Sequence, residues 1–378
     1  MGMNTGIKLR KDVRSILISA LFILMISLPD WTFGQARFSD NLKISGNYHF
    51  GVNLPEYDFF TYLTEDFVQS ADLCIVKETS GKNIWEDLYN YPEHGMSLFY
   101  TTLGNNAVYG QELSLNYFFK LNAIRTNRFK LYNRLGFGLG YVNRKFDAQS
   151  NYLNVAIGSH FNIHFNARLG AEFIINKKLE AGFGISFDHL SNANTSATNL
   201  GINTTTLFAG MSYMLRERTE KVKVEKTKHK PSNKLEIVSL IGGKVIRNSS
   251  FVSSYYGVFG ISVEGFRDIF RGFHIGVGTD IFYDTSIKTS LTSIGEPYQG
   301  FMSWQTGIHV SQSIVYNRFS VTIQEGFYVG LRNHIYDKVM YNRGIIKYRI
   351  TDHFTVRLTM KSHLHILDFP EFGFGYRF

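Results

Sequence analysis

Strict alternation of apolar residues with small or polar ones runs through most of this chain and constrains its fold more than any other feature. Residues 129–142 show it most clearly, since one set is apolar and the other is largely glycine: Leu135, Phe137, Leu139 and Tyr141 against Arg134, Gly136, Gly138 and Gly140. Side chains of a β-strand point to opposite faces with a period of two. A soluble sheet would expose charges on its second face, whereas glycine there fits the crowded interior of a small barrel.

Similar segments recur along the chain. Eight are expected before residue 216: 42–52, 68–78, 95–103, 110–121, 129–142, 154–175, 179–190 and 201–215. About eight more fit between Leu235 and Phe378. No run after residue 34 approaches the roughly 20 apolar residues of a membrane-spanning helix, so strands are the only means of crossing a bilayer. The sequence predicts an all-β, transmembrane antiparallel β-barrel fold.

The first 34 residues have the pattern of a secretory signal peptide. Four basic residues precede an apolar run from Ile16 to Leu28, and Thr32, Phe33 and Gly34 offer a small-residue cleavage site before Gln35. The single cysteine, Cys74, permits no internal disulfide and leaves the redox compartment undecided. The net charge of +9 comes without arginine clusters among stacking aromatics, so nucleic-acid binding is not expected.

A charge run divides the mature chain. Residues 216–230, RERTEKVKVEKTKHK, contain seven lysines and arginines and three glutamates, which is typical of a solvated connection. We therefore expect an eight-stranded unit at residues 35–216, a charged linker at 217–233 and a second β-barrel-like unit at 234–378. The length of the linker favours two barrels, because periplasmic turns within one barrel are short. One barrel of about 16 strands is the alternative.

Chemistry-bearing residues gather between Phe183 and Asn203. As a strand, this stretch places His189 and Ser191 on the apolar face with Phe183, Ile185 and Phe187. Residues i and i+2 of a strand have Cβ atoms roughly 6 to 7 Å apart, so the serine hydroxyl can reach a ring nitrogen. Histidine is the usual base for a serine nucleophile. Its second nitrogen needs an acceptor, and Asn203 on the next strand offers its side-chain carbonyl.

The order His189-Leu190-Ser191-Asn192-Ala193, followed by Asn199, Gly201 and Asn203, resembles the lipid A 3-O-deacylase (PagL-type) family, whose long members carry a C-terminal extension. The similarity extends back through Arg168 and Gly170. The resemblance implies an outer-membrane eight-stranded barrel that hydrolyses an acyl ester of lipid A without a cofactor or metal. It further implies Ser191 as nucleophile, His189 as base, and Asn192, Asn199 and Gly201 as oxyanion or positioning groups.

The C-terminal residues also fit an outer-membrane barrel. The final FGFGYRF, with its terminal aromatic, looks like the assembly signal of bacterial outer-membrane barrels.

One residue departs from the family pattern. The family has a glutamate where this chain has Asn203, so the acceptor is neutral and stabilises an imidazolium less than a carboxylate would. Asp188 is adjacent but belongs to the opposite face. We therefore expect slower ester hydrolysis than in a relative with the glutamate, or a carboxylate from elsewhere in the chain that takes its place.

The expected function is that of an outer-membrane carboxylic-ester hydrolase whose partners are lipid A, or lipopolysaccharide, and the surrounding lipids. Strand counting supports this, because a seventh strand that runs outward ends near Ser191 at the outer leaflet, where lipid A lies. A phospholipase or another lipid esterase is the alternative enzyme, since the residue pattern specifies ester cleavage but not the ester. A non-catalytic channel or scaffold with a decayed site is the alternative of another class.

The histidines His160, His164, His363 and His365 lack a third ligand at a recognisable spacing, so no metal site is expected.

Overall fold

The computed structural model describes residues 40–378 except 197, 224–228, 248–252, 332–338 and 364–365. The expected signal peptide, residues 1–34, lies outside the described residues. None of the described helices has the length and apolar character needed to cross a membrane.

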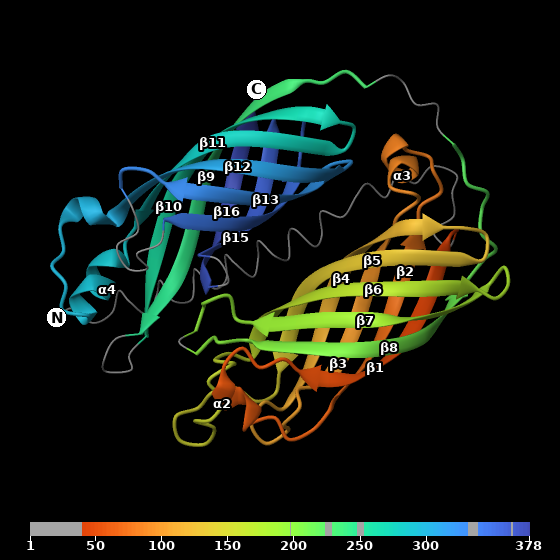
Figure 1. The fold of residues 1–378 in the computed structure, drawn as a ribbon, viewed down its shortest axis with the longest axis horizontal. Coiled ribbons are helices and arrows are strands. Elements are labelled where there is room, and N and C mark those ends of the chain that lie inside the picture. The colour runs from red at the N-terminus through yellow and green to blue at the C-terminus, as the bar shows by residue number, and fades with distance from the viewer. Residues whose placement is uncertain (1–39, 197, 224–228, 248–252, 332–338, 364–365) are drawn as a thin grey trace. The chain divides into compact units, whose positions relative to one another are not determined.

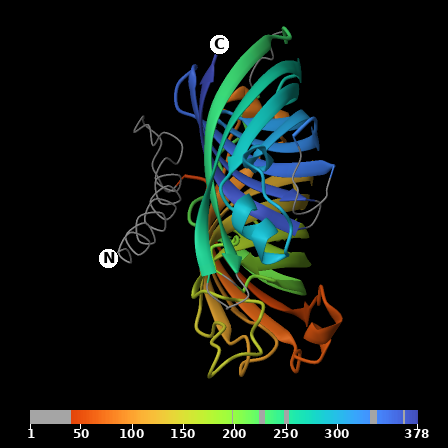
Figure 2. The same ribbon diagram turned by 90° about the vertical axis from the view of Figure 1, so that its left-hand side faces the viewer.

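The first eight strands form a closed antiparallel barrel in which each strand pairs with its neighbours in sequence and β1 pairs with β8. Figures 1 and 2 show this ring of tilted strands in two perpendicular views. The strands are β1 (Leu42–Asn53), β2 (Val68–Glu78), β3 (Glu93–Thr102), β4 (Gln111–Arg125), β5 (Phe129–Val142), β6 (Phe161–Ile174), β7 (Leu179–Ser191) and β8 (Ile202–Met214). Two short helices, α2 (Asp58–Thr61) and α3 (Ile84–Leu88), lie in the connections after β1 and β2.

The remaining eight strands close a second antiparallel barrel through pairing of β16 with β9. They are β9 (Asn233–Arg247), β10 (Ser253–Phe270), β11 (Phe273–Asp284), β12 (Trp304–Tyr316), β13 (Phe319–Tyr328), β14 (Met340–Arg349), β15 (Phe354–His363) and β16 (Ile366–Arg377). Helix α4 (Ile287–Ser293) and the 3-10 helix η1 (Gly300–Ser303) connect β11 to β12. The all-β barrel prediction is confirmed, and the alternative of one barrel of about 16 strands is wrong.

Alternation along the strands gives the first barrel an apolar outside and a polar inside. Large apolar side chains are more than half exposed on its outer face: Leu73, Ile75, Leu169, Phe183, Leu207 and Met211. Gly136, Gly138 and Gly140 face inward as the sequence predicts. A Cβ atom at Gly138 would lie 2.4 Å from Oδ1 of Asn116, so only glycine fits this crowded lumen.

The start of β6 differs from the sequence expectation. The structure begins this strand at Phe161 rather than at Asn154. The buried side chain of Asn154 accepts a hydrogen bond from the backbone N–H of Ile157 (3.1 Å) and donates to the carbonyl of Val108 (3.1 Å). Asparagine side chains that bond nearby backbone favour loops over strands, so residues 154–160 belong to the loop.

The two ends of the first barrel differ in the length of their connections. One end carries the turns 126–128 and 175–178, together with the connection that contains α3. The other end carries the loops 54–67, 103–110, 143–160 and 192–201. We call them the short-turn end and the long-loop end.

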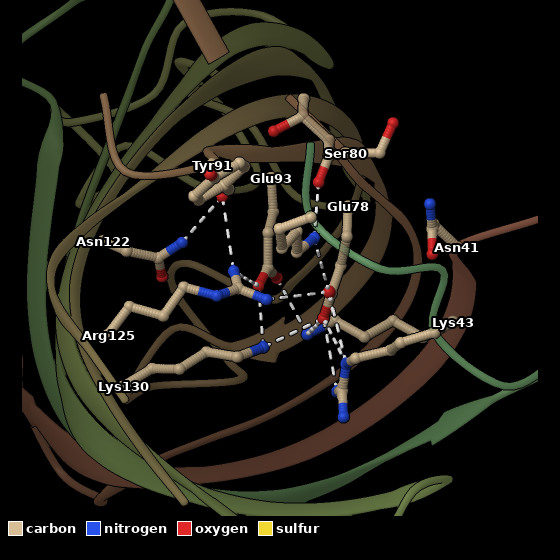
Figure 3. A network of polar contacts seen from close by, with 12 residues as sticks. Asn41, Lys43, Glu78, Ser80, Tyr91, Glu93, Asn122, Arg125 and Lys130 are labelled. Carbon is tan, nitrogen blue, oxygen red and sulfur yellow. Dashed lines mark hydrogen bonds and ion pairs between the residues drawn. The ribbon is translucent and has the colours of Figure 1, made fainter. Parts of the chain in front are cut away.

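A network of buried ion pairs fills the lumen at the short-turn end (Figure 3). Nζ of Lys130 lies 2.9 Å from carboxylate oxygens of Glu78 and Glu93 and 2.8 Å from Glu180. Nζ of Lys43 lies 2.8 Å from both Glu93 and Glu180. Burying a charge is tolerated only when it is paired in this way.

The charge run after β8 contributes to the same network. Arg218 pairs with Glu78 and Glu180, and Nζ of Lys221 donates to the carbonyl of Thr79 (2.5 Å). Burial lowers the pKa of Lys221 to about 8, although Glu78 opposes the shift. The sequence predicts that the whole charge run is solvated. Arg218 and Lys221 differ from that prediction, because both contact the end of the barrel.

Apolar side chains close the long-loop end. A buried cluster joins the loops to the strand ends: Phe60, Leu103, Val108, Tyr109, Val142, Ala156, Ile157, Leu190 and Ile202. The lumen of the first barrel is therefore filled at both ends.

Candidate active site

The candidate site lies where β7 reaches the long-loop end. Along β7 the outward face runs through Phe183, Ile185 and Phe187 to His189, which is half-buried. Ser191 follows two residues later at the end of the strand and is 9% exposed. The expected placement of histidine and serine at the end of an apolar outer face is therefore present.

Asn203 lies directly opposite His189 on β8. Its Oδ1 atom is 2.6 Å from Nδ1 of His189. An amide oxygen only accepts hydrogen bonds, so Nδ1 carries the proton and Nε2 is left with a lone pair. This tautomer is the one a general base requires, since Nε2 can then take a proton.

Gly201 packs against both His189 and Ser191. A Cβ atom at this position would be 3.0 Å from Cε1 of the histidine and 3.6 Å from Cβ of the serine. Its φ of +76° is also in the left-handed region, which other residues adopt at a cost. Glycine here lets the loop close over the two side chains. Within the described residues no hydrogen bond joins the serine hydroxyl to the imidazole.

Asn192 and Asn199 hold the loop between β7 and β8. The backbone N–H of Asn192 donates to Oδ1 of Asn199 (2.7 Å), and its side-chain amide donates to the carbonyl of Thr198 (2.8 Å). Ala193 and Asn194 adopt positive φ values of +51° and +60°. The two asparagines thus fix a tight, strained loop directly after Ser191.

Asp188 points into the lumen, away from His189. Its carboxylate is 3.1 Å from Nε2 of His164 and accepts the hydroxyl of Ser186 at 2.7 Å. It cannot serve as the acceptor for His189, in agreement with the alternation of β7.

A recess that the sequence does not predict adjoins Asn203 and Gly201. The connection 54–67 supplies Leu54, Glu56 and Phe60 to its wall, and Tyr109 completes it. The backbone N–H of Leu54 donates to the carbonyl of Asn203 (2.8 Å) and holds this connection beside the site. No motif in residues 54–67 marks them, because their proximity depends on the pairing of β1 with β8.

Two protein-family models match the sequence. The model described as lipid A 3-O-deacylase (PagL) matches residues 73–212, which include all six candidate site residues. The model described as acyloxyacyl hydrolase, C-terminal domain, matches residues 233–378. Together they cover well over half of the chain.

The chain belongs to the PagL family. Membership supports lipid A deacylation, a hydrolase reaction, as its general activity, with lipid A as the substrate. It also places this PagL-family protein in the outer membrane. No match was found among curated protein sequences.

Solved structures give weaker comparisons with this PagL-family chain. A ferric enterobactin receptor from Pseudomonas aeruginosa aligns at 11% identity and a TM-score of 0.22, over 84% of this chain but only 53% of the receptor. Omp33 from Acinetobacter baumannii aligns at 8% identity and a TM-score of 0.15, over 90% of this chain and 97% of its own. OmpF from Salmonella typhi aligns at 8% identity and a TM-score of 0.19, over 90% and 98%. Similarity this low supports no functional conclusion.

Proposed function

We propose that this protein hydrolyses an ester-linked acyl chain of lipid A with Ser191 as nucleophile, His189 as general base and Asn203 as the group that orients the imidazole. The contact between Nδ1 of His189 and Oδ1 of Asn203, with Ser191 two residues along the same outer face, is the observation that carries this proposal. It leaves Nε2 as the atom that takes the serine proton.

The reaction proceeds in two steps. Oγ of Ser191 attacks the ester carbonyl while its proton passes to Nε2, and the bond to the sugar oxygen breaks as His189 returns the proton to that oxygen. Water then attacks the acyl-serine, loses its proton to His189, and releases the fatty acid and the serine hydroxyl. Asn203 holds the ring throughout.

The position of the site on the barrel supports a membrane lipid as substrate. Outer-membrane barrels have short periplasmic turns and longer extracellular loops. By that pattern the long-loop end is extracellular, and the site lies at the outer leaflet. Since His189 belongs to the apolar outer face, a lipid can approach it from within the membrane.

Asn192 and Asn199 act as positioning residues in this proposal. The backbone N–H of Asn192 is already bonded to Asn199, so it is not an available oxyanion donor in this conformation. The pair instead fixes the chain direction immediately after the nucleophile. Gly201 provides room for the imidazole.

The filled lumen argues against a channel as the function of the first barrel. The ion-pair network occupies one end and the apolar cluster the other. A pore of this strand number would in any case have an interior just wide enough for side chains.

Mass spectrometry of lipid A from cells that express the protein tests the proposal. The wild type should remove one acyl chain, and Ser191→Ala should reduce this at least ~1,000-fold, as expected for loss of a nucleophile. Ser159→Ala is a matched control, because Ser159 lies at the same end and, among the described residues, its hydroxyl bonds only to Phe161 and Asn162. Identical lipid A with wild type and Ser191→Ala would contradict the proposal. Loss of acyl chains from phospholipids alone would favour a phospholipase.

A further inference from the structure

The second barrel contains a cavity of about 170 Å³ at the end of its lumen where the turn 317–318 lies. Five of the lining residues are cationic: Lys234, Arg318, Lys347, Arg349 and Arg377. Two are carboxylates, Glu264 and Asp268, and His274 completes the titratable set. The rest of the wall is half polar (Ser313, Asn317 and Ser320) and half apolar (Phe266, Val315 and Phe319).

The two carboxylates already have partners of their own. Asp268 lies 2.7 Å from Nε2 of His274 and accepts the hydroxyl of Ser232 at 2.7 Å. Glu264 accepts the hydroxyl of Ser311. Both carboxylates keep their negative charge, but among the described residues neither forms an ion pair with a lysine or arginine of the cavity.

Most of the cations have no anionic partner. Lys347 pairs with Glu236, but among the described residues Lys234, Arg318, Arg349 and Arg377 form no ion pair. Arg318 donates to the carbonyl of Ile350 at 2.9 Å, which is a neutral acceptor.

Arg377 gives the clearest sign of a missing partner. The residue is only 8% exposed, and its buried Nε has no hydrogen-bond partner within the described part of the chain. Its guanidinium lies 5.2 Å from the centre of the Phe266 ring, on the wall of the same cavity. Leaving a buried donor unpaired costs free energy, and an anion in the cavity would remove that cost.

We propose that this cavity binds the phosphate group of a small soluble molecule, with Arg349, Arg377 and Lys234 as its ligands. Guanidinium groups match phosphate oxygens through paired hydrogen bonds, and lysine adds a point charge. The cavity is smaller than the ~300 to 1,000 Å³ typical of drug-sized ligands, so it suits a phosphate with few further atoms rather than an acyl chain. By the short-turn rule for outer-membrane barrels it faces the periplasm.

Isothermal titration calorimetry on the full chain in detergent micelles, at constant ionic strength, tests this site. The probes are inorganic phosphate and sn-glycerol 3-phosphate. Saturable binding of at least one probe to the wild type is expected. Tighter binding of inorganic phosphate would identify the ligand as the free ion, and tighter binding of sn-glycerol 3-phosphate would identify it as a phosphate ester. Arg349→Gln with Arg377→Gln should raise the Kd at least tenfold. Arg267→Gln is the matched control, since it removes one charge from the exposed outer face at the same end and should leave the Kd unchanged.

Two results would overturn the site. One is the absence of saturable binding of both probes to the wild type. The other is a Kd that the double variant does not change, or that Arg267→Gln changes equally. If the double variant fails to form a heat-modifiable barrel on gels, Lys234→Gln replaces it. This single change, of a half-buried residue at the start of β9, should also raise the Kd.

Discussion

In the proposed mechanism Asn203 determines how well His189 works as a base, because its Oδ1 lies 2.6 Å from Nδ1 and sets the tautomer of the ring. A neutral amide fixes the ring but adds no negative charge beside it. When Ser191 gives up its proton the ring becomes cationic, and a carboxylate at position 203 would stabilise that cation more than the amide does.

Substitution of Asn203 tests this role. Asn203→Leu removes the acceptor and should lower the deacylation rate about tenfold, which corresponds to one lost hydrogen bond. Asn203→Glu restores the acceptor with a charge and should retain or raise the rate. Initial rates of fatty-acid release from purified lipopolysaccharide give the comparison. An unchanged rate for Asn203→Leu, or a folded but inactive Asn203→Glu, would argue against an orienting function.

For single residues, the sequence predicts the face of the strand on which a side chain lies better than the hydrogen bonds that the side chain makes. The period of two was enough to place His189 on the outer face and Asp188 inside, and the structure agrees. The bonds of Asn192 to Asn199 and Thr198 depend on a loop with positive φ at Ala193 and Asn194, and alternation says nothing about such a loop. The sequence also does not predict the recess beside Asn203, which Glu56 lines. Residues 54–67 form a connection without a repeating pattern, so alternation does not show which residues they contact.

The elements of the first barrel are held together at the short-turn end by charges from seven strands, β1 to β7, and from the segment after β8. Glu78, Glu93, Glu172 and Glu180 meet the buried amines of Lys43, Lys120 and Lys130. Arg125 and Arg218 add to the cationic side. Removing one member therefore leaves others buried without compensation.

Lys130→Met should destabilise the barrel by roughly 3–5 kcal/mol, the range for breaking a buried ion pair. Lys177→Met is the control, since Lys177 is 80% exposed and, in the part of the chain that the structure describes, pairs with Glu217 alone. Such surface pairs contribute little. Urea unfolding followed by the heat-modifiable gel shift measures both. Equal stability of the two variants would contradict a structural role for the network.

The docked segment after β8 gives a prediction for pH. The pKa of Lys221 is lowered from 10.5 to about 8, chiefly by burial. Between these values the unfolded chain holds a proton that the folded chain has released, so stability rises with pH across about pH 8 to 10.5. The Lys221→Met variant should lack this rise of stability between about pH 8 and pH 10.5. Melting temperatures of both proteins from pH 7 to 10.5 check it, and parallel curves would contradict the docking.

For the whole molecule, the number of strands and the polarity of their faces were predictable, but the closure of the barrels was not. Pairing of Lys43 with Met214 across β1 and β8 closes the first ring, and pairing of β16 with β9 closes the second. Alternation is a local property and is equally compatible with one large barrel. The length of the charged segment favoured two barrels, but only long-range pairing distinguishes the two arrangements. The unit boundaries at residues 216 and 234 and the signal peptide stay predictions.

The central claim is that Ser191, on the outer face of the first barrel, is the nucleophile. Peptide mass spectrometry after reaction of the active protein with an alkyl fluorophosphonate measures this directly, because Oγ forms a bond to phosphorus as fluoride leaves. The proposal predicts one adduct, on Ser191, that appears in step with loss of deacylation and is absent from Ser191→Ala. An active protein that loses its activity through an adduct at another residue, with Ser191 unmodified, would contradict it.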